Sequence, residues 1–267
     1  MKESRVLRAT LEYDGTRYRG WQAQVNARTV GGAFAGAVRE VLGDTVRIHG
    51  AGRTDAGVHA FAQVASIHPP RPAATAEIPR LRREVNDRLP ADIHLLALAP
   101  APATFHARHD AQLRIYRYRL SRRRTAFGKP FVFWVKDRLD ADAMREAAAF
   151  LPGRHDFGSF CENPEGHDST AVEVAWARVE TPAAAPDLIL FRIAASHYLW
   201  RMVRRVVGTL VEVGTGRLDP GRMGELLAAR SAEPAKWTAP PSGLFLEAVL
   251  YDGDPPPPEI DPLRPAY

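Results

Sequence analysis

The sequence predicts an α+β protein in which two ferredoxin-like (RRM-like) halves pair antiparallel sheets around a central basic cleft. The first observation is that strand and helix patterns alternate in a β-α-β-β-α-β order over residues 5–99. The second is that residues 113–252 follow a similar order, without a residue-level repeat. The third is the formal net charge of +5, which permits a basic surface between two such halves.

The first half opens with a strand that ends at the turn signal Asp14-Gly15. Its first helix has apolar residues at helical spacing and begins after Thr29, a favoured N-cap residue. The expected elements are a strand at 5–13, a helix at 30–42, strands near 45–49 and 58–67, a helix at 78–88 and a strand at 92–99.

The second half is expected to follow the same plan. Its elements are a strand at 113–120, a helix at 140–151, strands at 171–180 and 188–195, helices at 197–213 and 219–229, and a last strand at 243–252. We therefore predict an N-terminal half over 1–107 and a C-terminal half over 108–254. The tail, 255–267, is too rich in proline to join a sheet and is expected to be an extended arm.

Composition excludes several classes of protein. The chain is 45% hydrophobic and 25% charged, which is typical of a folded domain, and no apolar run reaches the length of a membrane span. The N-terminus has no apolar signal-peptide core, so we expect a cytoplasmic protein that does not enter a membrane. The single cysteine, Cys161, can form neither an internal disulfide nor a cysteine-based zinc site, and a buried or incidental thiol is expected.

The cationic residues are strongly biased toward arginine. Four of the 36 are lysine, so 36 − 4 = 32 are arginine. Arginine binds phosphate as a fork and stacks on bases, which suits RNA. Codon bias explains the same excess equally well, because the chain is also rich in alanine and proline. The charge therefore permits an RNA-binding function without establishing one.

The segment GAGRTDAGVHA, residues 50–60, is the strongest candidate for a reactive loop. Its glycines permit left-handed turns and close approach of a ligand to the backbone. Arg53 and Asp55 lie two residues apart among small side chains, as in a reaction centre built from a carboxylate and a guanidinium. The alternative is a tight hairpin in which Asp55 caps a turn.

The string GRTDAGVHA resembles the signature of the TruA family of transfer RNA pseudouridine synthases. Further segments similar to that family occur in the same order along nearly the whole chain. They are LEYDGTRYRGWQ, NDRLPADI, TFHAR, YRYRL, RMVRRVVGTLVEVG and APPSGLFLEAV. Several independent matches in one order make coincidence a poor explanation.

The resemblance implies an isomerase, in the sense of an intramolecular transferase, that converts uridine to pseudouridine at tRNA positions 38, 39 and 40 in the anticodon stem-loop. It implies a homodimer that needs no cofactor and no metal. It makes Asp55 the catalytic residue, and leaves open whether Asp55 attacks the sugar, attacks the base or removes a sugar proton. The competing hypothesis is a non-catalytic RNA-binding module of the same fold.

The chemistry fits one carboxylate. Breaking a glycosidic bond develops positive charge on the sugar, which a carboxylate stabilises or captures. Glycosidases need a second carboxyl group because they activate water, whereas an isomerase keeps the base. The target base must leave its stack, and the resemblance assigns the filling of that vacated space to Arg53. A simple ion pair with Asp55 or a phosphate contact is the alternative for Arg53.

The resemblance extends the site to Tyr116 and Arg204. Tyr116 corresponds to a family tyrosine that stacks on the target uracil and is a candidate for handling the C5 proton, with a core aromatic as the alternative. Arg204 corresponds to the arginine that pairs with the catalytic aspartate, with a solvated arginine as the alternative. Tyr118 lies on the same strand face as Tyr116 and is expected to be a core aromatic. Arg201 and Arg205 point away from the apolar stripe of the helix at 197–213, and we expect phosphate contact or solvation for both.

Two other groups of residues need an explanation. The densest basic run is a candidate RNA track, with a merely solvated run as the alternative; it comprises Arg114, Arg117, Arg119, Arg122, Arg123 and Arg124. His106 and His109 have no third metal ligand nearby, so a metal site is not expected, and His59 is expected to be structural.

The chain departs from the family pattern at three positions. Gly31 stands where the family usually has glutamine, His197 where it has a small residue and Tyr198 where it has phenylalanine. Trp21, in the first family-like segment, is expected to pack. These departures touch packing or RNA contact and leave the Asp55, Tyr116 and Arg204 set intact.

Overall fold

The computed structural model describes residues 3–256 and 261. By its internal contacts the chain forms two compact units. The first holds the residues up to Gln112 together with Leu246–Pro255, and the second holds Leu113–Phe245. The last strand of the chain thus belongs mainly to the first unit. The sequence-based division at 107/108 stays a prediction about folding units.

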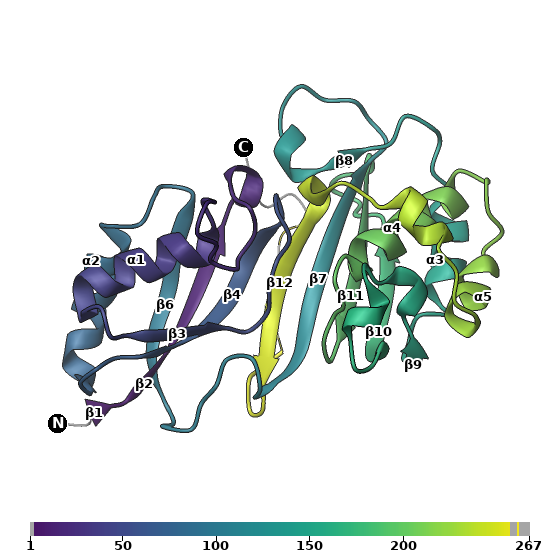
Figure 1. Cartoon of the computed structure of the whole chain (residues 1–267). Helices are drawn as coiled ribbons and strands as arrows, with labels where there is room; N and C mark the ends of the chain where they lie inside the picture. Colours follow the sequence, from purple (N-terminus) through teal and green to yellow (C-terminus); the bar gives the residue numbers. More distant parts are fainter. Residues whose placement is uncertain (1–2, 257–260, 262–267) are drawn as a thin grey trace. The chain divides into compact units, whose positions relative to one another are not determined.

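The first unit is an antiparallel sheet covered by two helices (Figure 1). Its strand order is β6-β2-β4-β12, with β3 paired to β4. The elements are β2 (Val6–Tyr13), α1 (Val30–Leu42), β3 (Arg47–Gly50), β4 (His59–His68), α2 (Ile78–Asn86), β6 (Ile93–Ala101) and β12 (Leu244–Tyr251), with β1 (Glu3–Ser4) paired to β5 (Ala73–Ala74). All six elements predicted for residues 5–99 are present.

Helix α1 shows why these predictions succeed. The Thr29 side chain accepts a hydrogen bond from the N–H of Gly32 and so caps the helix where the sequence predicted. One face, including Phe34 and Val38, is buried at helical spacing. The helix ends where Gly43 adopts a φ of 96°, a conformation that favours glycine.

The second unit contributes the antiparallel strand order β7-β11-β10-β9, with the short strand β8 parallel to β7. Its elements are β7 (Ala111–Ser121), β8 (Phe133–Trp134), α3 (Ala141–Ala148), β9 (Gly153–Asp156), β10 (Ala171–Glu180), β11 (Leu188–Ala195), α4 (Met202–Gly214) and α5 (Arg222–Ala228). Helix α3 packs against α4 and β10. The predicted bounds of β10 and β11 are confirmed to the residue.

Short 3₁₀ helices occur between these elements. They are η1 (Gly15–Arg17), η2 (Thr75–Glu77), η3 (Lys129–Phe131), η4 (Gly158–Phe160), η5 (Pro164–Gly166), η6 (Glu233–Trp237) and η7 (Pro241–Gly243).

Two predictions in the second unit were wrong in detail. The helix expected from residue 197 begins at Met202, because Arg201 has a φ of 62° and interrupts the backbone. Strand β9 was not predicted, because four residues that alternate between partly buried and exposed give almost no hydrophobic pattern. The α+β class with mainly antiparallel pairing is confirmed. No helix among the described residues is long and apolar enough to cross a bilayer.

Four histidines come together in the first unit. His49 lies on β3, His68 ends β4, and His106 and His109 follow β6. The ring of His49 lies 5.6 Å from that of His68 and 4.8 Å from that of His106, and the rings of His106 and His109 are 4.3 Å apart. The Nδ1 atom of His106 accepts hydrogen bonds from two backbone N–H groups, which occupies a lone pair that a metal would need. No group of three possible ligands in the described residues is arranged to hold a metal ion.

This cluster predicts a loss of stability under mild acid. Burial and the neighbouring His49 lower the pKa of His68, and burial and His109 lower the pKa of His106. The other charged groups nearby are Arg47, which lowers the pKa of His68, and Asp110, which opposes the lowering at His106. An unfolded histidine titrates near pH ~6.5. Below that pH the unfolded chain therefore binds more protons at these histidines than the folded protein does.

We therefore expect the free energy of unfolding to fall as the pH drops from 7.5 to 5, a window above the titration of ordinary carboxylates. Urea unfolding at several pH values measures it. The double variant His68→Gln/His106→Gln should show a shallower fall, whereas His94→Gln, an exposed histidine on β6, should behave like the wild type. Equal slopes for all three proteins would contradict the assignment.

Candidate active site

Asp55 lies in a loop of eight residues, 51–58, between β3 and β4. Thr54 is buried, Asp55 is half-buried and Arg53 is exposed. The N–H of Val58 donates to the carbonyl of Asp55 at 3.1 Å, which closes a turn. Asp55 thus enters the turn through its backbone.

The segment 13–21, which begins at the last residue of β2, supports this loop through hydrogen bonds. Gly57 N–H donates to Tyr18 O at 3.2 Å, and Trp21 N–H donates to Thr54 O at 3.1 Å. The hydroxyls of Tyr13 and Thr54 lie 2.8 Å apart and form a buried hydrogen bond. The residues on either side of Asp55 are therefore fixed to a rigid strand end, which favours a defined position for the carboxylate.

Two glycines make this close approach possible. A Cβ on Gly15 would lie 1.9 Å from the carbonyl oxygen of Val58, and a Cβ on Gly20 would lie 2.5 Å from that of Thr54. Gly20 also has a φ of 89°. Any side chain at either position would push the loop away from its support.

We therefore expect Gly20→Ala to lower kcat by at least about tenfold, because an ångström of misplacement at a reacting group is costly. The Kd for tRNA should stay within a few-fold of the wild-type value, since the basic surface is retained. Single-turnover kinetics and a binding titration measure the two effects. Gly43→Ala is the matched control: Gly43 has a φ of 96°, but a Cβ there would meet no atom within 4 Å, so this variant carries the backbone strain alone. Equal kcat for both variants would refute the positioning role.

His59 is buried directly after the loop, as a structural residue would be. Its Nδ1 lies 3.1 Å from Asp14 Oδ1 and 3.1 Å from the backbone nitrogen of Gly15. Burial raises the pKa of Asp14, but hydrogen bonds from His59 and Thr16 outweigh it and bring the pKa to about 2. This pair ties the start of η1 to the start of β4, next to the reactive loop.

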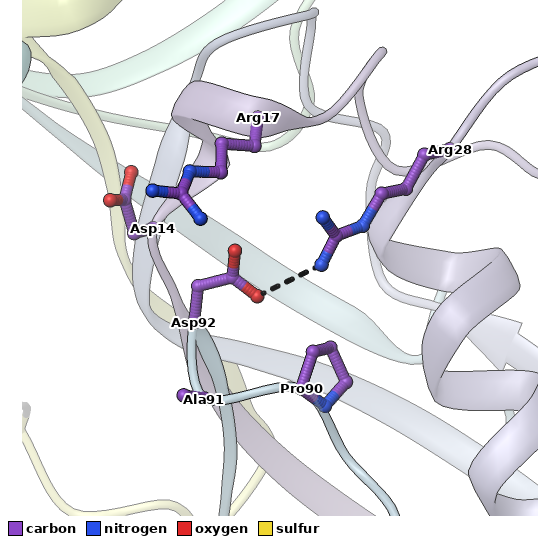
Figure 2. A pocket seen from close by; sticks show the side chains of 6 residues that line it. All are labelled: Asp14, Arg17, Arg28, Pro90, Ala91 and Asp92. Atoms are coloured by element: carbon purple, nitrogen blue, oxygen red, sulfur yellow. Dashed lines mark hydrogen bonds and ion pairs between the residues drawn. The ribbon is translucent and has the colours of Figure 1, made fainter.

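A charged cavity of about 530 Å³ lies beside this support (Figure 2). Its walls are Asp14, Arg17, Arg28, Pro90, Ala91 and Asp92. Arg28 is 3.5 Å from Asp92 and lies over the ring of Tyr18 at 4.6 Å, so its charge is already engaged. Arg17 also reaches into this space in Figure 2.

Three arginines of the reactive loop and its supporting segment, 13–21, remain open to a ligand. Arg17, Arg19 and Arg53 are exposed and make no ion pair or side-chain hydrogen bond with the residues that the structure describes. Phosphate is the ligand that suits unpaired guanidinium groups close to a reactive loop. The sequence analysis did not single out Arg17 or Arg19, although both lie in the family-like segment LEYDGTRYRGWQ.

In the second unit, β7 carries the two predicted tyrosines. Tyr118 is fully buried and its hydroxyl donates to Pro240 O at 2.7 Å, so it packs in the core as expected. Tyr116 is 7% exposed, and its ring meets that of Tyr198 edge to face at 4.9 Å.

Arg204 lies in the first turn of α4, half-buried. Its Nε donates to Ala239 O at 2.8 Å, and Ala239 N–H donates to Arg204 O at 3.0 Å. Burial raises the pKa of Tyr118, and the positive charge of Arg204 acts against that rise, which places the guanidinium near this tyrosine. Arg204 and Tyr118 are thus brought together within the second unit, whereas Asp55 and Arg53 belong to the first.

The other two arginines of this segment share one carboxylate. Arg205 is 7% exposed, donates to Cys161 O at 2.6 Å and forms an ion pair with Glu162. Of the two states expected for Arg205, phosphate contact or solvation, solvation was wrong, because η4 and Cys161 pack against α4 at this residue. Arg201 is partly exposed, lies 3.5 Å from Glu162 and 5.5 Å above the ring of Trp200. Cys161 itself is buried, as expected.

The predicted basic run divides into two parts. Arg114, Arg117 and Arg119 are buried on β7, so they form neither a solvated run nor a surface track in the free protein. Arg122, Arg123 and Arg124 follow the strand and are exposed. The density of arginine in the sequence could not separate the two parts. Side chains alternate between the two faces of a strand, and because both faces of β7 are buried, none of its three arginines is exposed to solvent.

Local packing explains two of the departures from the family pattern. A Cβ at Gly31 would lie 2.4 Å from Trp21 O, which also accepts a hydrogen bond from Gly31 N–H. Trp21 is buried, as expected. The hydroxyl of Tyr198, absent in phenylalanine, donates to Ile193 O at 2.8 Å. His197 is exposed, and nothing in the structure explains its choice.

An α+β chain with a supported aspartate in a glycine-rich loop and an arginine-rich surface is suited to chemistry on RNA. Comparison with protein families is consistent with this: the model of the tRNA pseudouridine synthase family matches residues 9–110 and 147–252. The chain therefore belongs to the tRNA pseudouridine synthase family, which makes it an isomerase and not a non-catalytic RNA-binding module.

Individual relatives agree with this assignment. The chain is 42% identical over 253 residues to the tRNA pseudouridine synthase A of Moorella thermoacetica, covering 92% of this chain and 99% of the relative. It is 37% identical over 245 residues to the protein of the same name from Thermotoga petrophila, covering 91% and 98%. It is 38% identical over 247 residues to that of Brevibacillus brevis, covering 92% and 99%.

Proposed function

We propose that this enzyme isomerises uridine to pseudouridine at positions 38, 39 and 40 of the tRNA anticodon stem-loop, as a cytoplasmic homodimer without cofactor or metal. The similarity to proteins named tRNA pseudouridine synthase A supports the substrate. The observation that carries the proposal is the position of Asp55, fixed on both sides by the hydrogen bonds of Thr54 and Gly57.

In the proposed reaction the N1–C1′ bond of the target uridine breaks and a C5–C1′ bond forms. The proton at C5 leaves and N1 gains a proton, so the reaction needs no water and no oxidant. Asp55 stabilises or captures the sugar carbon, or removes a sugar proton, while the base turns. Tyr116 stacks on the uracil and handles the C5 proton, and Arg204 pairs with the Asp55 carboxylate and keeps it ionised.

The remaining assignments concern RNA binding. Arg53 is exposed on the same loop and fills the space that the flipped base leaves. Arg201 contacts phosphate, and Arg205 does so only after its ion pair with Glu162 opens. The exposed Arg17 and Arg19 add to this surface. The finer architecture, two ferredoxin-like halves around a basic cleft, belongs to the same proposal.

The decisive experiment incubates the protein with an unmodified tRNA transcript and maps pseudouridine at single-nucleotide resolution. New pseudouridine at positions 38 to 40 supports the proposal. Binding without any new pseudouridine overturns the proposal. The same map on total RNA looks for modification elsewhere, which would show that the enzyme acts on a different uridine. Analytical ultracentrifugation tests the homodimer.

A further inference from the structure

A second candidate RNA-binding feature lies in the second unit and begins with the exposed part of the basic run, Arg122, Arg123 and Arg124. We name residues 122–132 the arginine arm; it links β7 to β8 (Figure 1). Hydrogen bonds close its base: Arg122 N–H donates to Asp187 O at 2.8 Å, and Val135 N–H donates to Ser121 O at 3.0 Å. The arm is therefore anchored to the sheet at both ends.

The tip of the arm is also ordered. The Thr125 hydroxyl donates to Phe127 O at 3.1 Å and accepts from Phe127 N–H at 3.1 Å. Gly128 has a φ of 70°, and its carbonyl accepts from Phe131 N–H at 2.9 Å. These bonds fix the backbone of Phe127, so a ligand that binds there does not have to order the turn first.

Phe127 is 83% exposed, although burial of a phenylalanine side chain is favoured in free energy over its exposure to water. Phe131, four residues later, does pack, with its ring 6.4 Å from that of Phe245. A single exposed apolar side chain is common on protein surfaces, so the cations and tryptophans around Phe127 decide whether it marks a binding contact.

The charge of the arm indicates the partner. Residues 121–138 contain six cations, Arg122, Arg123, Arg124, Lys129, Lys136 and Arg138, and one carboxylate, Asp137. Lys129 and Lys136 make no ion pair or side-chain hydrogen bond with any residue in the described part of the chain. The same arm of a second copy would bring like charges together here, whereas a polyanion would be attracted.

A groove of about 330 Å³ next to the arm has matching chemistry. Trp134 and Trp237 line it together with Lys136 and Lys236. Arg124 already lies over the Trp134 ring at 5.4 Å. Aromatic faces combined with cations are the means by which proteins hold unpaired bases and their phosphates.

We propose that the arginine arm binds an unpaired nucleotide of the substrate tRNA, apart from the uridine that reacts. Phe127 stacks on the base, and Arg124 and Lys129 bind the flanking phosphates. The inference rests on tRNA being the substrate, but not on which uridine is modified. The arm lies outside the two stretches, 9–110 and 147–252, that match the family.

Binding titrations with an unmodified tRNA transcript test the proposal on the full-length protein. Phe127→Ala should weaken binding about tenfold, and Phe127→Tyr should bind like the wild type, because stacking needs an aromatic face. Phe127→Leu keeps the apolar surface and should bind like the alanine variant. Phe150→Ala removes another exposed phenylalanine and should have no effect. A perfect RNA duplex, which offers no unpaired base, should bind the wild type and Phe127→Ala equally.

Several results would overturn the proposal. Unchanged tRNA affinity of Phe127→Ala would do so, as would full affinity of Phe127→Leu, which would indicate simple apolar contact. Dissociation of a homodimer by Phe127→Ala at unchanged affinity would assign the arm to a subunit interface. Pseudouridine formation by the wild type is measured in parallel, so a protein that binds through Phe127 but modifies no uridine would refute the proposed function alone.

Discussion

Asp55→Asn should abolish pseudouridine formation, with a loss on the order of 10⁴-fold or more, as expected for removal of a group that reacts directly. The amide has the same size as the carboxylate but can neither capture an electron-poor sugar carbon nor accept a proton. The loop should keep its shape, because the hydrogen bonds that hold it use the backbone of Thr54 and Gly57. The affinity for tRNA should therefore stay within about tenfold of the wild-type value.

Single-turnover assays with mapped pseudouridine measure the loss, and titration with the same tRNA measures affinity. Asp44→Asn is the matched control, because Asp44 is an exposed carboxylate of the same unit that follows α1. It makes the same change of charge and should be fully active. Wild-type turnover by Asp55→Asn would remove this residue from the chemistry, while equal losses in both variants would point to charge alone.

The sequence predicted the elements whose signals are local. The cap at Thr29, the turn at Asp14-Gly15, the alternation along β10 and the apolar run of β11 each depend on a few neighbouring residues. The loop that carries Asp55 was found for the same reason, since its glycines and small residues are adjacent in sequence. A long motif shared with a family added the role of that loop.

What the sequence could not show depends on layers that are distant along the chain. Arg205 looks solvated on an isolated helix, yet a segment some 40 residues earlier supplies Glu162 and the carbonyl of Cys161. Arg114, Arg117 and Arg119 appear as a surface run until β7 is seen to be buried. The support of the Asp55 loop by Tyr13 and Tyr18 was equally hidden, because a buried hydroxyl or carbonyl partner leaves no pattern in the sequence.

Several glycines of this chain mark places where backbone meets backbone, and Gly208 is the most demanding. It lies in the middle of α4, where glycine is normally unfavourable by about 1 kcal/mol relative to alanine. A Cβ at this position would lie 1.6 Å from the carbonyl oxygen of Trp237 and 2.5 Å from its carbonyl carbon. Both obstacles are backbone atoms, so no change of rotamer relieves the clash.

We therefore expect Gly208→Ala to lower the free energy of unfolding by about 3 kcal/mol, at the upper end for overpacking, because α4 or η6 must move. The same shift should separate Arg204 from Ala239, whose two hydrogen bonds cross this contact, and turnover should fall as well. Urea unfolding and single-turnover kinetics measure the two effects.

Gly36→Ala provides the contrast, since Gly36 lies in α1 and a Cβ added there would meet nothing within 4 Å. There the helical preference of alanine acts alone and should raise stability by about 0.5–1 kcal/mol. The two substitutions are chemically identical and both occur inside helices, so an opposite sign isolates the contact with Trp237 as the cause. A Gly208→Ala protein as stable as the wild type would show that α4 can leave η6 at no cost, and the position of Arg204 would then need another support.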